Sequence, residues 1–149
     1  MSWLKSSPEQ KHLQANFTIE RPVRFADIDA AGWLYYPRFF EYCHNAFEDW
    51  INTKAPVGYP EAIDKQRWGF PAVKASGEYL APLKHGDIAQ VSIRILNVGN
   101  SSLKTGFEII RKHDQTPSFK AEITTVCVNL DLGKSMPIPA NMRAFLTQS

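Results

Sequence analysis

One long stretch of this chain repeats apolar residues with the spacing of a helix. After Pro37 they recur at i, i+3, i+4, i+7 and i+8, which places them on one helical face. The residues on this face are Phe39, Phe40, Cys43, Phe47, Trp50 and Ile51. A proline is favourable at the first helical position, so the pattern predicts a helix from Pro37 to about Thr53. The apolar face of this helix has to be buried against another layer, whereas the polar face can remain in contact with water.

The rest of the chain is dominated by alternating apolar and polar residues, which is typical of half-buried strands. Strands are expected at about 17–25, 70–81, 91–95, 103–109 and 119–130, a helical turn at 61–65 and a short final helix at 142–146. The strand at 119–130 is expected to be central because its middle is apolar or β-branched on both faces. One helix among antiparallel strands predicts an α+β fold, with a curled five-stranded sheet around one long central helix.

The length and composition of the chain limit the classes of protein to which it can belong. At 149 residues the chain is expected to form one domain, residues 16–149, after a polar and aperiodic arm over residues 1–15 that we expect to be flexible. A net charge of +2 without a recognition motif gives no reason to expect nucleic acid as a partner. No apolar run is long enough to span a membrane. Cys43 and Cys127 lie within apolar patterns and are expected to be buried free thiols, which favours the cytoplasm.

The residues between the first strand and the helix carry the candidate chemistry. Asp27 and Asp29 follow the strand, and Gly32 allows a tight turn before the helix begins. A helix N-terminus attracts negative charge, whether it belongs to a carboxylate or to an oxyanion that forms in a reaction. Either acid could instead serve only as a turn or capping residue, since aspartate is common in both roles.

The stretch from Phe25 to Phe40 and the order of elements resemble the hot-dog-fold acyl-CoA thioesterases. The 4-hydroxybenzoyl-CoA thioesterase branch has the pattern Asp-x-Asp-x-x-Gly, then Tyr-Pro, then an aromatic-rich helix, and the resemblance covers about residues 17–145. It implies hydrolysis of an acyl-CoA thioester to a carboxylic acid and coenzyme A, without a metal or a separate cofactor. It also implies a homodimer or homotetramer in which coenzyme A binds across a subunit interface.

Within that resemblance, Asp29 corresponds to the catalytic carboxylate, as nucleophile or general base, and the backbone N–H of Tyr36 would polarise the thioester carbonyl. The implied substrate contacts are Gly32, Trp33, Phe40, His44, Ser102 and Lys104. On its own, the position of His44 fits a satisfied core histidine as well as a substrate contact. Asp27 is expected to be structural, either as a turn acid or as a partner of Arg24 or Arg38.

Two other functions remain open at this point. A strand followed by Asp27 and Asp29 also looks like the start of a haloacid-dehalogenase-type phosphatase, in which paired acids hold Mg²⁺. A non-catalytic acyl-binding module would keep the helix and its pocket but would not need Asp29. Hydrolysis that survives a chelator would exclude the first alternative, and loss of activity in Asp29→Asn would exclude the second.

Overall fold

The computed structural model describes residues 15–148, so most of the predicted N-terminal arm lies outside the described residues. The longest helix is α2 (Tyr36–Lys54), close to the predicted bounds, and it follows a short 3₁₀ turn, η2 (Phe25–Asp27). A π-helical segment, η3 (Glu61–Gln66), occupies the site of the predicted helical turn, and the chain ends in α3 (Ala140–Thr147). The main strands are β1 (Phe17–Pro22), β3 (Ala72–Tyr79), β4 (Ile88–Val98), β5 (Ser102–Arg111) and β6 (Thr116–Val126).

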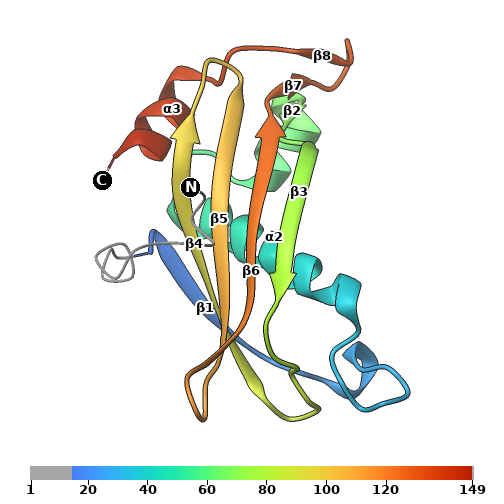
Figure 1. Ribbon diagram of the computed structural model, residues 1–149. Coiled ribbons are helices and arrows are strands. Elements are labelled where there is room, and N and C mark those ends of the chain that lie inside the picture. The colour runs from blue at the N-terminus through green and yellow to red at the C-terminus, as the bar shows by residue number, and fades with distance from the viewer. Residues whose placement is uncertain (1–14, 149) are drawn as a thin grey trace.

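These five strands form one antiparallel sheet in the order β1-β4-β5-β6-β3 (Figure 1). The predicted five-stranded sheet is therefore confirmed. The strand predicted to be central, β6, pairs on both sides with β5 and β3, but β5 holds the middle position. Pro22 is the last residue of β1, and β1 is an edge strand, which is a place that tolerates proline.

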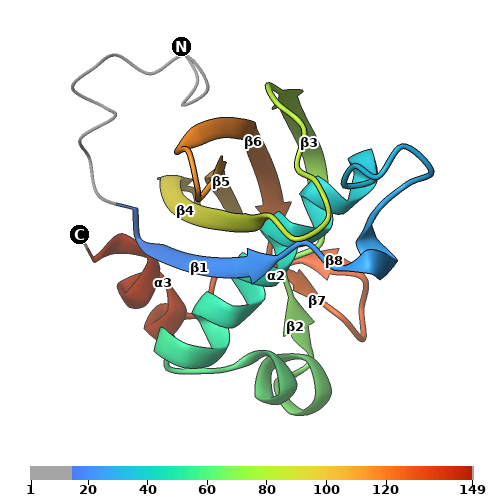
Figure 2. The same cartoon turned by 90° about the horizontal axis from the view of Figure 1, so that it is seen from below.

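The sheet curls around α2, which lies along its inner face (Figure 2). Seven residues of α2 are buried there: Phe39, Tyr42, Cys43, Ala46, Phe47, Trp50 and Ile51. They belong to the same core as inward-facing sheet residues such as Val91, Phe107 and Phe119. The predicted helical face is thus the buried one, except that Phe40 lies at its margin and is only partly buried.

A second, three-stranded sheet was not predicted. It consists of β2 (Trp68–Gly69), β7 (Val128–Asn129) and β8 (Lys134–Ser135) in the order β2-β7-β8. Strands of two residues are too short to show an alternating pattern. The single strand predicted at 119–130 is in fact two strands, β6 and β7, which belong to different sheets and are separated by Cys127.

The edge strand β3 is exposed along its whole length. All of its residues are solvent-accessible in the single chain, and Val73 is 63% exposed. On one side β3 pairs with β6, and among the described residues no strand pairs with its other side. An open strand edge with exposed apolar side chains is a surface on which another strand can pair.

Candidate active site

The turn that precedes α2 is built around the carboxylate of Asp29. Its Oδ1 accepts hydrogen bonds from the backbone N–H groups of Ala31, at 2.9 Å, and Trp33, at 3.3 Å. The backbone of Asp29 also bonds to Trp33 and Gly32, which closes the turn. Gly32 has a φ of +83°, a conformation that glycine adopts at little cost. The side chain of Asp29 is therefore held in place but remains solvent-accessible.

Asp27 has the opposite environment. It is only 6% exposed, and its Oδ2 accepts hydrogen bonds from the Tyr42 hydroxyl, at 2.7 Å, and from the backbone N–H of Arg24, at 3.1 Å. Burial alone would raise the pKa of Asp27, but these hydrogen bonds and the nearby guanidinium groups lower it below its usual value. Its direct partners are thus a tyrosine hydroxyl and a backbone amide, which makes Asp27 a buried, hydrogen-bonded acid of the core.

Tyr36 is the first residue of α2, and its N–H has no acceptor within the helix, as for every first-turn amide. Both backbone groups of the preceding residue, Tyr35, form hydrogen bonds. The N–H of Tyr35 donates to the carbonyl oxygen of Asp27 at 3.0 Å, and the carbonyl oxygen of Tyr35 accepts from the N–H of Arg38 at 2.9 Å. Pro37 follows and supplies no N–H. The amide of Tyr36 therefore lies at a fixed helix start, seven residues after Asp29.

Asp29 and Tyr36 line the same groove, which encloses about 360 Å³. Its other lining residues are Trp33, Leu34, Phe39, Tyr79, Leu80, Ala81 and Pro82. The walls are mainly aromatic and aliphatic, and several of them are open in the single chain, for example Trp33 at 47% and Tyr79 at 46% exposed. An apolar groove with one carboxylate and a helix-start amide that has no acceptor among residues 15–148 suits an acyl group with a reactive carbonyl.

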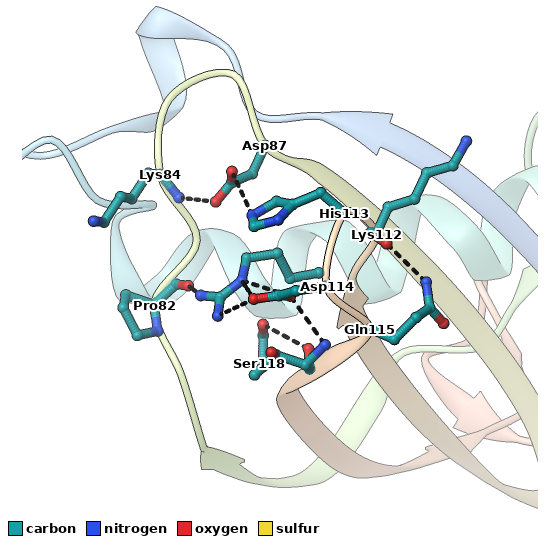
Figure 3. Close-up of polar contacts among 10 residues, drawn as sticks. Pro82, Lys84, Asp87, Lys112, His113, Asp114, Gln115 and Ser118 are labelled. Carbon is teal, nitrogen blue, oxygen red and sulfur yellow. Dashed lines mark hydrogen bonds and ion pairs between the residues drawn. The ribbon is translucent and has the colours of Figure 1, made fainter.

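The wall formed by residues 80–82 is anchored by the ends of β5 and β6 on either side of the turn that joins them. The N–H groups of Leu80 and Ala81 donate to the carbonyl oxygen of Ser118, and Arg111 donates through Nη1 to the carbonyl oxygen of Pro82 at 2.9 Å. Arg111 is itself held by a bidentate pair with Asp114, the shorter contact being 2.8 Å. Figure 3 shows this turn, with Pro82 and Asp114 on either side of the guanidinium group that binds both, and with His113 facing Asp87 of the adjoining loop.

The loop after the wall is joined to the Asp29 turn by its backbone. The N–H of Leu34 donates to the carbonyl oxygen of Leu83 at 2.7 Å, and Trp33 forms an isolated β-bridge with Lys84. The carboxylate turn and the opposite wall are therefore connected through backbone hydrogen bonds as well as through the groove. Neither Tyr79 nor residues 80–82 were predicted from the sequence. They lie at the end of a strand, and no local pattern indicates which turn that end will meet.

The other residues that were predicted to contact the substrate lie in several parts of the structure. Gly32 and Trp33 lie in or beside the groove, as already described. Phe40 packs against Phe119, with ring centroids 5.1 Å apart, while its neighbour Phe39 lines the groove. His44 is exposed on α2 and its Nε2 lies 3.4 Å from Glu48, so the alternative of a core histidine is wrong.

Ser102 and Lys104 lie at the far end of the sheet. Tyr79 pairs with Phe119, and Phe119 pairs with Ile109, so the groove is level with Ile109 of β5. Ser102 and Lys104 precede Ile109 by seven and five residues, which is about 23 and 16 Å along a strand. Lys104 forms an ion pair with the largely buried Glu122 at 3.2 Å. Within one chain, these two residues are not brought to the groove.

Comparison with known proteins identifies the family to which this fold belongs. The family model described as the thioesterase-like superfamily matches residues 23–146. A 1,4-dihydroxy-2-naphthoyl-CoA hydrolase from Synechocystis is 30% identical over 123 residues, which cover 83% of this chain and 88% of the relative.

Solved structures show the same fold. A 1,4-dihydroxy-2-naphthoyl-CoA thioesterase from Synechocystis has a TM-score of 0.79 and 28% identity, over 87% of this chain and 94% of that one. A gentisyl-coenzyme A thioesterase has a TM-score of 0.75 at 23% identity, over 85% of this chain and 98% of that one. The sheet wrapped around α2 is therefore the hot-dog fold.

The chain belongs to the thioesterase-like superfamily. It is an acyl-CoA thioesterase, an enzyme that hydrolyses acyl-CoA thioesters to a carboxylic acid and coenzyme A. Within residues 15–148, no helix has the length and apolar character needed to cross a membrane.

Proposed function

We propose that Asp29 carries out the hydrolysis and that the backbone N–H of Tyr36 stabilises the oxyanion. The observation that supports this most directly is the groove itself, which brings Asp29 and the start of α2 together against apolar walls. Oδ1 of Asp29 is occupied by two N–H groups of its own turn, whereas Oδ2 accepts no hydrogen bond from the residues that the structure describes. An oriented carboxylate with one free oxygen is suited to act on a bound carbonyl.

Two chemical routes to hydrolysis would use the Asp29 carboxylate and the N–H of Tyr36. In the first, Oδ2 of Asp29 attacks the thioester carbon, the carbon–sulfur bond breaks, and coenzyme A leaves as a thiolate that then takes up a proton. Water hydrolyses the resulting mixed anhydride, which releases the acid and restores the carboxylate. In the second, Asp29 removes a proton from water as the water attacks the carbonyl. The carbon–sulfur bond of the tetrahedral intermediate then breaks, and the proton on Asp29 passes to the coenzyme A thiolate. In both routes negative charge develops on the carbonyl oxygen, where the N–H of Tyr36 would stabilise it.

For the acyl group we propose an aromatic ring, with 1,4-dihydroxy-2-naphthoyl as the first candidate. Trp33, Phe39 and Tyr79 give the groove aromatic walls on which a flat ring can pack. Relatives of this chain are named as hydrolases of the naphthoyl thioester. A hydrolysis screen over naphthoyl-, benzoyl-, short-chain and long-chain acyl-CoAs, with thiol release as readout, tests the assignment. A preference for long aliphatic chains would overturn it.

We further infer that the enzyme is at least a dimer formed through β3 and that coenzyme A binds across the interface, as in the family it resembles. The open edge of β3 and the exposed groove residues support a second subunit at this face. In an antiparallel pair of β3 strands, the far end of the partner sheet lies level with the groove. Ser102 and Lys104 of the partner subunit would then approach the nucleotide end of coenzyme A, and a tetramer of two such dimers is compatible with this pairing.

We propose that hydrolysis needs no metal or cofactor beyond the coenzyme A of the substrate. The two acids do not form a shared site, because Asp27 is buried against Tyr42 whereas Asp29 lines the groove. Thiol release should therefore persist in EDTA, and loss of activity that Mg²⁺ restores would mean that the hydrolysis depends on a metal ion. The two buried free cysteines support a reducing setting, and we infer the cytoplasm.

Asp29→Asn tests the central assignment. The substitution keeps the shape of the side chain and removes its charge, so kcat should fall by at least about 10²-fold while substrate still binds. Asp49→Asn, an exposed acid on α2, is the matched control and should keep wild-type kcat. An Asp29→Asn enzyme that keeps more than about a tenth of wild-type kcat on its best substrate would show that a group other than Asp29 carries out the hydrolysis.

A further inference from the structure

The side chain of Tyr79 crosses from the end of the edge strand to the start of α2. Its hydroxyl donates a hydrogen bond to the carbonyl oxygen of Tyr36 at 2.8 Å, and this bond joins residues 43 positions apart in the chain. Tyr79 is the last residue of β3 and pairs with Phe119 of β6. Its hydroxyl therefore links the sheet to the residue whose amide is the proposed oxyanion donor.

The ring of Tyr79 is held by other aromatic rings. It lies edge-on to Phe39, with centroids 5.2 Å apart and planes at 90°, and it packs against Phe119 at 4.9 Å. Phe39 and Phe119 are both buried in the core. The position of the Tyr79 hydroxyl is thus set by the core and by the strand register, and does not depend on the hydrogen bond alone.

The bond to Tyr36 completes the restraints on the helix-start amide. The carbonyl oxygen of Tyr35, which belongs to the same peptide unit as the N–H of Tyr36, is fixed by Arg38. The next carbonyl along the chain, that of Tyr36, is fixed by the Tyr79 hydroxyl. With a hydrogen bond to the carbonyl on each side of it, the Tyr36 N–H is restrained in its orientation.

We propose that Tyr79 is a positioning residue that keeps the N–H of Tyr36 aimed at the thioester carbonyl. This inference rests on the proposed role of Tyr36. The hydroxyl of Tyr79 acts through the backbone, since its proton is already given to the carbonyl oxygen of Tyr36. Burial raises the pKa of Tyr79 above its usual value, so the hydroxyl stays protonated and remains a donor across the neutral range.

Tyr79→Phe removes the hydroxyl and keeps the ring. With benzoyl-CoA as substrate, kcat should fall about 3- to 10-fold, as expected for the loss of one neutral hydrogen bond that matters in the transition state. KM should stay within about twofold, because the ring that lines the groove is unchanged. Tyr59→Phe is the matched control, since Tyr59 packs on Phe47 away from the groove, and it should leave both constants at their wild-type values.

A spectroscopic probe separates positioning from a general loss of structure. A ketone analogue of benzoyl-CoA, with CH₂ in place of the thioester sulfur, binds without reacting, and its carbonyl stretch falls in frequency when a donor bonds to the oxygen. The bound frequency should be higher in Tyr79→Phe than in wild type and unchanged in Tyr59→Phe. An unchanged frequency in Tyr79→Phe, or a kcat equal to wild type, would overturn the proposal.

The same probe distinguishes failure of this inference from failure of the proposed function. Asp29→Asn should bind the ketone with the wild-type frequency, because it leaves the helix-start amide intact. If Asp29→Asn stays active, the catalytic assignment is wrong, yet the frequency in Tyr79→Phe still reports whether Tyr79 orients the donor. If the ketone carbonyl shows no lowered frequency in wild-type enzyme, the role of Tyr36, and with it that of Tyr79, is wrong.

Discussion

Asp27 and Asp29 are two residues apart and have the same side chain, but the structure places them in opposite surroundings. The short 3₁₀ turn η2 directs Asp27 into the core against Tyr42, and the next turn leaves Asp29 at the groove. A carboxylate that is buried in the core cannot reach a substrate, whereas an accessible one can. The sequence pattern Asp-x-Asp therefore combines one structural acid with one acid that is available for chemistry.

This contrast predicts separate effects of the two amide substitutions on stability. Asp27→Asn should lower the free energy of unfolding at pH 7 by about 1–3 kcal/mol, because Tyr42 loses a charged hydrogen-bond acceptor in the core. Asp29→Asn should lower it much less, since its carboxylate is exposed. Urea unfolding of both variants, with Asp49→Asn as the surface control, measures the difference.

The stability cost of Asp27→Asn should also depend on pH in a definite direction. The pKa of Asp27 is lowered in the folded protein, so its charge stabilises the fold above the pKa of the unfolded state, about 3.9. That contribution is lost as the pH falls through the folded value. The gap between wild type and Asp27→Asn should therefore be constant near neutrality and narrow below about pH 4. A gap that widened on acidification would contradict the assignment.

At the scale of elements, β3 and α2 approach closely at a glycine. A Cβ atom at Gly77 would lie 2.6 Å from Cζ of Phe119 and 2.9 Å from Cζ of Phe40. Phe119 is fully buried, so an added methyl group at this position would have to displace a packed core ring. The absence of a side chain lets the two phenylalanine rings fill the space under β3.

Gly77→Ala is therefore expected to destabilise the protein by about 1–3 kcal/mol through overpacking. The direction of this change in stability is informative, because replacing glycine by alanine at an unstrained position usually stabilises a protein by about 0.4–1 kcal/mol. Ser76→Ala, at the adjacent exposed position of the same strand, should have little effect on the melting temperature. Equal melting temperatures for Gly77→Ala and Ser76→Ala would show that Phe119 can relax.

The turn between β5 and β6 gives a second prediction at this scale. Arg111→Lys keeps the charge but cannot bond to Asp114 in bidentate fashion and also reach the carbonyl of Pro82. The groove wall at 80–82 should loosen, and KM for acyl-CoA should rise about threefold to tenfold while kcat falls less. Lys112→Gln, which removes an exposed ion pair from the same turn, is the control. A wild-type KM in Arg111→Lys would mean that Ser118 alone holds the wall.

At the scale of the whole molecule, the parts that could be predicted are the ones encoded locally. Asp29 and Tyr36 are seven residues apart and are separated only by a local turn that Asp29 itself closes, and the stripe from Phe39 to Ile51 already defines the buried face of α2. Tyr79 and Pro82 could not be predicted, because their place depends on which strand end reaches the Asp29 turn. The second sheet could not be predicted because strands of two residues are too short to show an alternation of apolar and polar residues.

The separation of the groove from Lys104 has a consequence for mixed assemblies. If each site takes Asp29 from one subunit and Lys104 from its partner, a dimer of one Asp29→Asn chain and one Lys104→Ala chain contains one intact site and one doubly defective site. Each variant alone should be weak. After unfolding and refolding an equal mixture, about half of the dimers are hybrids, and activity should recover to about a quarter of the wild-type value. Two defective enzymes would thus restore function to each other by exchanging subunits.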